Sequence, residues 1–135
     1  MRKGAPVTWL RRLWQDRRGQ SVVEFALVAP VMLLLVFGMI QFGLVLNAEL
    51  TLTEAVRQGA QIVASGGSAQ AATEVVLADA PMVQDPSVSV SPSGSQITLS
   101  ATGSYPVLVP DLPFLGSSVP LSASITMLTQ APPGS

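Results

Sequence analysis

The apolar positions of this chain first form one long uninterrupted run. Residues 25–46 read FALVAPVMLLLVFGMIQFGLVL, and no charged residue occurs between Glu24 and Glu49. An apolar helix of about 20 residues crosses a bilayer core about 30 Å thick. We therefore predict a membrane span over residues 25–46. A buried helix of a soluble core fits poorly, because such helices rarely stay apolar on every face for this length.

Beyond the span, the apolar positions follow a helical period. They recur at i, i+4, i+7, i+8, i+11, i+12 and i+15, which indicates one stripe of an amphipathic helix. The stripe consists of Ala48, Leu52, Ala55, Val56, Gly59, Ala60 and Val63. Ser65-Gly66-Gly67 then provides a helix end. We predict one helix over residues 20–65, of which 47–65 form the amphipathic continuation.

Strict alternation of polar and apolar residues marks the C-terminal part. After a short predicted helix over 68–80, residues 87–91 (SVSVS) and 96–102 (QITLSAT) alternate on either side of the turn sequence PSGS. This pattern predicts a β-hairpin. Residues 105–113 (YPVLVPDLP) contain three prolines and suit an edge or a loop better than a central strand. Residues 119–130 are the last predicted strand.

The predicted fold class is α+β. A long transmembrane helix extends into an outer domain, residues 68–130, with a short helix and a small antiparallel sheet. The inner face of the sheet is expected to cover the helix stripe. We expect the tail, residues 131–135, to be disordered.

Charge is divided unevenly between the two ends of the chain. Six of the seven basic residues lie in the first 18 positions against the single acid Asp16, a balance of +5. After position 18, the chain has one basic residue, Arg57, and seven acidic residues, a balance of −6. Placed before a bilayer-length apolar run, this division indicates membrane topology and not nucleic-acid binding. The positive-inside rule puts the N-terminus in the cytoplasm and residues from about 47 onward outside the cytoplasmic membrane.

The composition argues against an enzyme. The chain has no cysteine and no histidine, which removes thiolate chemistry, the commonest general base and the commonest metal ligand. Asp79, Asp85 and Asp111 show no paired spacing. We therefore assign no catalytic, cofactor-binding or metal-binding residue.

The junction between the leader and the span carries the most specific motif. Arg17 and Arg18 precede Gly19, and Glu24 is the fifth residue after that glycine, at the edge of the apolar run. A carboxylate costs up to about 3 kcal/mol at the centre of a membrane helix and less near its end.

A secretory signal is the rival interpretation of the apolar run 25–46, but the apolar region of such a signal spans about 7–15 residues before a small-x-small site. The run here is longer, and Leu-Asn-Ala at 46–48 matches such a site poorly.

Residues 17–64 resemble the TadE-like pseudopilins of the tight adherence (Tad) pilus, which are related to type IV pilins. That family typically shows GxxxVEFALVxP, FGxxEFG and TxAxRxGA elements. The matching residues here are Gly19, Val23, Glu24, Phe25, Ala26, Leu27, Val28, Pro30, Phe37, Gly38, Gln41, Phe42, Gly43, Thr53, Ala55, Arg57, Gly59 and Ala60. Gln41 is the departure, because the family often has a second glutamate at that position.

The resemblance implies processing and assembly roles for this motif. A prepilin peptidase would remove the leader, residues 1–19, by cleaving between Gly19 and Gln20. Glu24 would pair with the new amino terminus of its own chain or of a neighbour, in an assembly segment that includes Phe25 and Pro30. The alternatives are a plain helix-start glycine at position 19 and an unpaired, snorkelling acid at position 24.

The resemblance also implies partners: other Tad pilins or pseudopilins and membrane platform proteins, in addition to the lipid bilayer. Gly38 and Gly43 allow close approach of helices in the span, and Gly59 is a further candidate packing residue. Arg57 either forms a surface i,i+3 pair with Glu54 or contacts a partner. Two functions compete: a structural subunit needed to assemble a Tad-type pilus, and a single-pass anchored binding module that needs no processing.

Overall fold

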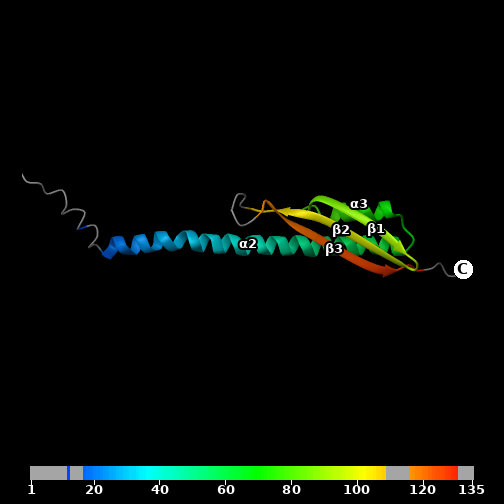
Figure 1. Cartoon of the computed structure of the whole chain (residues 1–135), viewed down its shortest axis with the longest axis horizontal. Helices are drawn as coiled ribbons and strands as arrows, with labels where there is room; N and C mark the ends of the chain where they lie inside the picture. The colour runs from blue at the N-terminus through cyan, green and yellow to red at the C-terminus, as the bar shows by residue number, and fades with distance from the viewer. Residues whose placement is uncertain (1–11, 13–16, 109–115, 131–135) are drawn as a thin grey trace, which may run out of the picture. The chain divides into compact units, whose positions relative to one another are not determined.

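The structure, a computed structural model, describes residues 12, 17–108 and 116–130. Its elements in chain order are α2, α3, β1, β2 and β3 (Figure 1). The chain divides into two compact units, Met1–Ile40 and Gln41–Ser135. The predicted α+β class is confirmed, because a long apolar helix is followed by a short helix and a three-stranded antiparallel sheet. Most of the predicted leader, the predicted tail and Asp111 lie outside the described residues.

Helix α2 extends over Arg17–Ala64, a length of 48 residues. It ends in a Schellman motif, in which Gly67 N–H donates to Ile62 O at 2.8 Å and Gly66 N–H donates to Val63 O at 3.1 Å. Gly66 has a φ of +91°, a left-handed conformation that glycine adopts without steric strain. The two glycines therefore end the helix where the sequence predicts.

Helix α3 covers Ala69–Asp79, within the predicted range 68–80. Ser68 caps its N-terminus, because the Ser68 side chain accepts a hydrogen bond from Ala71 N–H at 3.1 Å. This bond satisfies a backbone donor that has no partner inside the helix. Pro81 follows the helix and favours its termination.

Three antiparallel strands form one sheet in the order β1-β2-β3. The strands are β1 (Gln84–Ser93), β2 (Gln96–Pro106) and β3 (Ser118–Leu128). Strands β1 and β2 form the predicted hairpin. Strand β3, the predicted last strand, pairs along the other edge of β2, so β2 is the central strand.

The prediction for residues 105–113 is wrong at the start of that range. Tyr105 and Pro106 are not in a loop or in a separate edge strand but are the last residues of the central strand β2. They pair with β3 alone, because the register between β1 and β2 ends at Ser104. A proline can occupy this position because the end of β2 has a strand neighbour on one side only.

Strand β1 extends beyond the predicted segment 87–91 at both ends, and its N-terminal extension contains a bulge. The register with β2 shifts between Gln84 and Ser87. Asp85, within this shift, has a φ of +49°, a conformation that aspartate tolerates better than most residues. The bulge therefore allows a turn-forming Asp-Pro pair to lie inside an edge strand.

The core lies between α2, α3 and the inner face of the sheet. Six of the seven predicted stripe positions are buried, and Val63 is half-buried. The other buried core residues are Val76, Ala80, Val83, Leu99, Ala101, Leu121 and Ala123. The outer domain thus covers the apolar stripe of α2 as predicted.

The opposite face of the sheet presents hydroxyl groups in rows across the strands. Two of these rows are Ser89-Ser100-Ser124 and Ser91-Thr98-Thr126. The hydroxyl oxygens lie 3.1 Å apart in the Ser100–Ser124 pair and 2.9 Å apart in the Thr98–Thr126 pair. Cross-strand pairs of this kind contribute roughly 0.2–1 kcal/mol each. The alternating sequences therefore encode one buried face and one uncharged hydroxyl face.

Gly59 lies where α2, α3 and β2 approach one another most tightly around the stripe. A Cβ atom at this position would lie 2.7 Å from Leu99 Cδ2, 3.0 Å from Val76 Cγ2 and 3.2 Å from Ala72 O. All three neighbours belong to buried residues, so they have little room to move. The contact therefore requires a residue without a side chain.

We expect Gly59→Ala to lower the free energy of unfolding by about 1–2 kcal/mol. Overpacking a core costs typically about 1–3 kcal/mol, and the three close contacts at Gly59 favour the upper part of that range, about 2–3 kcal/mol. The higher helix propensity of alanine offsets about 1 kcal/mol of this cost. Denaturant unfolding of the full chain in detergent measures this change. Gln61→Ala, an exposed position of the same helix, is the matched control and should change stability by less than about 0.5 kcal/mol. A Gly59→Ala protein as stable as the parent would contradict the packing argument.

Candidate functional site

The predicted processing and assembly residues lie in the first turns of α2. Gly19, Gln20 and Glu24 are helical and exposed. Phe25 and Pro30 are also exposed, and the helix continues through Pro30. These five residues are therefore accessible on one helix.

The surface of α2 around and after this motif is apolar and exposed. Its large exposed side chains include Val22, Leu27, Met32, Leu34, Phe37, Met39, Ile40 and Phe42. Among the described residues, this helix is long and apolar enough to cross a membrane over Gly19–Ala64, and its most apolar 18-residue stretch has no share buried. Apolar surface of this extent is unfavourable in water by roughly 25 cal/mol per Å². Contact with lipid or with other apolar helices would remove this surface from water.

The Glu24 carboxylate is exposed at the edge of this surface. It forms no ion pair or hydrogen bond with another described residue. A buried carboxylate is strongly unfavourable unless it is paired. In apolar surroundings, an ion-pair or hydrogen-bond partner would therefore stabilise the Glu24 carboxylate.

The four candidate packing residues fall into different environments. A Cβ atom at Gly38 or Gly43 would meet no atom within 4 Å, so both positions are open to another helix. At Gly59, the space that a side chain would take is instead filled by core residues of the same chain. Arg57 is exposed, and no ion pair joins it to Glu54 or to another described residue. The i,i+3 pair is thus not formed in the structure.

Gln41 joins α2 to the end of β2. Its Nε2 donates to Pro106 O at 3.4 Å, and its Oε1 accepts from Leu108 N–H at 2.8 Å. A side-chain amide can donate and accept at once, whereas a glutamate carboxylate only accepts. The sequence marks Gln41 as the one strongly polar residue of the apolar run, but it does not identify partners that lie 65 and 67 positions away.

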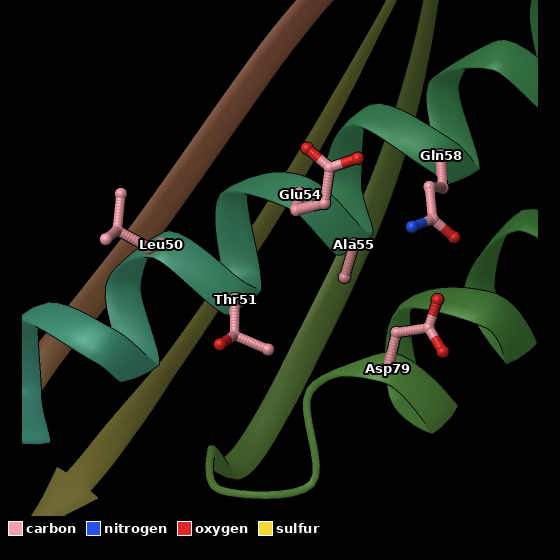
Figure 2. Close-up of a pocket in the computed structure, with 6 residues that line it drawn as sticks. All are labelled: Leu50, Thr51, Glu54, Ala55, Gln58 and Asp79. Atoms are coloured by element: carbon pink, nitrogen blue, oxygen red, sulfur yellow. The ribbon is translucent and has the colours of Figure 1, made fainter.

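An open groove with a volume of about 480 Å³ lies between α2 and α3. Figure 2 shows the residues that line it. Its lining residues are Leu50, Thr51, Glu54, Ala55, Gln58 and Asp79. The Thr51 hydroxyl donates to Asn47 O at 2.8 Å. The two carboxylates have no imidazole or thiolate beside them, and the described residues contain no cluster of three or more metal-ligating side chains. The groove offers no arrangement of nucleophile, base and oxyanion donor.

The comparison with protein families matches residues 19–61 to the family described as TadE-like protein. The matched segment begins at the candidate cleavage-site glycine and includes Glu24, Gln41 and Arg57. Over these residues the chain is similar to TadE-like proteins. No significant match was found among curated proteins or among solved structures.

The TadE-like segment contains the whole apolar run and most of the helix stripe, whereas the sheet follows it. The match confirms the resemblance of residues 19–61 to TadE-like proteins. TadE-like proteins form a structural, pilus-related family. The single membrane-length helix in the described residues is consistent with a membrane-anchored component of that system.

Proposed function

We propose that this chain is a pseudopilin or minor-pilin-like subunit needed to assemble a Tad-type pilus. The observation that carries the proposal is the division of roles along α2. Its C-terminal stripe is buried in the core of its own chain, whereas its TadE-like N-terminal part exposes apolar side chains and an unpaired Glu24. Such a helix is suited to associate with lipid and with the helices of other subunits.

The proposed membrane orientation follows from charge. The basic leader lies in the cytoplasm and the sheet lies outside the cytoplasmic membrane, as the positive-inside rule predicts. The same arrangement exposes the bond after Gly19 to a prepilin peptidase on the cytoplasmic side. Cleavage there makes Gln20 the new N-terminus, four residues before Glu24.

In the proposed assembly, Glu24 pairs with a new amino terminus, and Phe25 and Pro30 belong to the same contact. Gly38 and Gly43 provide open positions for close helix approach. Exposed Arg57 is available to a partner outside the membrane. Other Tad pilins, pseudopilins and membrane platform proteins are the proposed partners, in the membrane or in the pilus at the cell surface.

The cleavage site gives the direct test. Mass spectrometry of the protein purified from Tad-producing cells should find an N-terminus at Gln20. Gly19→Val should retain the leader, because a side chain would keep the backbone away from the peptidase carboxylates. Gly38→Val is the matched control and should be cleaved normally, since that glycine lies far along the helix.

An intact Met1 leader, in cells that process other prepilins, would overturn the pilin-like function. It would favour the second function, a single-pass anchored binding module whose outer domain captures a ligand. The uncharged hydroxyl face of the sheet is the surface that such a module would present.

A further inference from the structure

The side chain of Gln41 takes the place of a strand neighbour at the end of β2. Its amide bridges Pro106 O and Leu108 N–H, the two backbone groups on either side of Val107. On the other side of the same segment, Val107 N–H donates to Ser117 O at 3.1 Å. Strand β1 cannot supply this neighbour, because its register with β2 ends at Ser104. Pro106 O, Val107 N–H and Leu108 N–H are therefore hydrogen-bonded within the protein, with partners on both sides of the segment.

This pairing occurs inside the apolar run of α2. Gln41 lies five residues before the end of the run and eight residues before Glu49, which is about 12 Å along a helix. Phe42 and Leu46, close to Gln41 on α2, are exposed, and Leu108 is 53% exposed. The sheet thus brings an exposed leucine to the level of the apolar helix surface.

We propose that this end of the sheet is a lipid-contacting foot, made of Gln41, Phe42, Leu46, Val107 and Leu108. Its ligand is the bilayer at the boundary between acyl chains and headgroups. The foot has no charged residue, and its helix residues Phe42 and Leu46 are exposed apolar side chains within the same compact unit as Leu108. The inference rests on the proposed membrane placement of α2.

The proposed role of Gln41 follows from contact of the foot with lipid. Backbone groups that face hydrocarbon must be paired within the protein, because no water is present to satisfy them. The Gln41 amide donates to Pro106 O and accepts from Leu108 N–H. The same two hydrogen bonds therefore pair the polar atoms of the Gln41 side chain. A polar residue in the apolar run is thereby made compatible with lipid.

The depth of the foot can be measured with spin labels, because the chain has no cysteine. Single variants Leu108→Cys, Leu128→Cys and Met39→Cys of the full chain are labelled and placed one copy per nanodisc of phosphatidylcholine and phosphatidylglycerol. Collision rates with oxygen, which enters lipid, and with a polar nickel chelate are compared. Leu128 is a matched exposed leucine (66%) at the far end of β3, and Met39 (74% exposed) reports the candidate span.

The labels at 108 and 39 should favour oxygen, and the label at 128 should favour the nickel chelate. If the label at 39 favours oxygen and the labels at 108 and 128 report the same aqueous exposure, the foot is wrong and the membrane span stands. If the label at 39 also reports water, the membrane placement itself fails. Protection at 108 that appears only with two copies per nanodisc would identify a second copy as the occupant and overturn the lipid assignment.

A second measurement tests Gln41 independently of lipid depth. Gln41→Leu removes both side-chain hydrogen bonds, so hydrogen exchange of the Leu108 amide should become about fivefold to tenfold faster. Gln41→Glu keeps an acceptor for Leu108 N–H and should have the smaller effect. Unchanged exchange in Gln41→Leu would show that the amide does not secure the strand end.

Discussion

Replacing Leu52 with alanine should lower the free energy of unfolding of the C-terminal unit by about 3 kcal/mol. Leu52 is fully buried, at 0% exposure, in the stripe of α2 that the sheet covers. Removing a buried leucine side chain forfeits its transfer free energy and leaves a cavity, which together cost about 2–5 kcal/mol. For a unit of this size the midpoint of thermal unfolding should fall by more than about 10 °C.

Leu50→Ala is the matched control for this experiment. Leu50 is two residues away on the same helix but is 68% exposed, so its replacement should change stability by less than about 0.5 kcal/mol. Circular dichroism of the full chain in detergent follows both melts. Equal destabilisation by the two substitutions would show that the stripe is not the core of the unit.

Glu24→Ala should strongly reduce pilus assembly and leave cleavage after Gly19 largely intact. In the proposed assembly, Glu24 pairs with an amino terminus in apolar surroundings. Removing one partner of a buried ion pair costs about 3–5 kcal/mol, since the other charge is left without compensation. A loss of about 3 kcal/mol corresponds to subunit association that is roughly 100-fold weaker.

Electron microscopy of pili and cross-linking of membrane subunits report assembly, and mass spectrometry of the mature protein reports cleavage. Glu49→Ala is the matched control, because Glu49 is an exposed glutamate of the same helix beyond the apolar run. It should leave both readouts near the parent level. Loss of cleavage with normal assembly in Glu24→Ala would reverse the assigned role.

Helix α2 has two patterns of apolar residues, and the sequence shows where one gives way to the other. Up to Leu46 the apolar residues surround the helix, so no single face is distinguished. From Ala48 onward they form a stripe, and that stripe is buried by the chain itself. The first pattern is the one expected of a helix that lipid contacts on every face, and the second is the one expected of a helix that a small sheet covers on one face.

Local rules made much of the fold predictable from the sequence. Helix period, strand alternation and turn residues depend on nearby positions, so the stripe, the hairpin, the last strand and the glycine end of α2 could all be predicted. The TadE-like motif is also local, and the family match over residues 19–61 agrees with it. The roles assigned to Gly19 and Glu24 remain predictions that cleavage and assembly experiments test.

Long-range contacts were decided only by the tertiary structure. The proline-rich segment after Ser104 was misjudged because no local rule shows that β1 stops there and leaves Pro106 with one neighbour. Gly59 looked like a possible partner contact, yet its space is set by Leu99 and Val76 from other elements. The sequence alone determined a membrane-length helix, its TadE-like motif and an α+β domain. The partners of Gln41 were decided by folding, because hydrogen bonds to residues 65 and 67 positions away form only when the sheet packs against the helix.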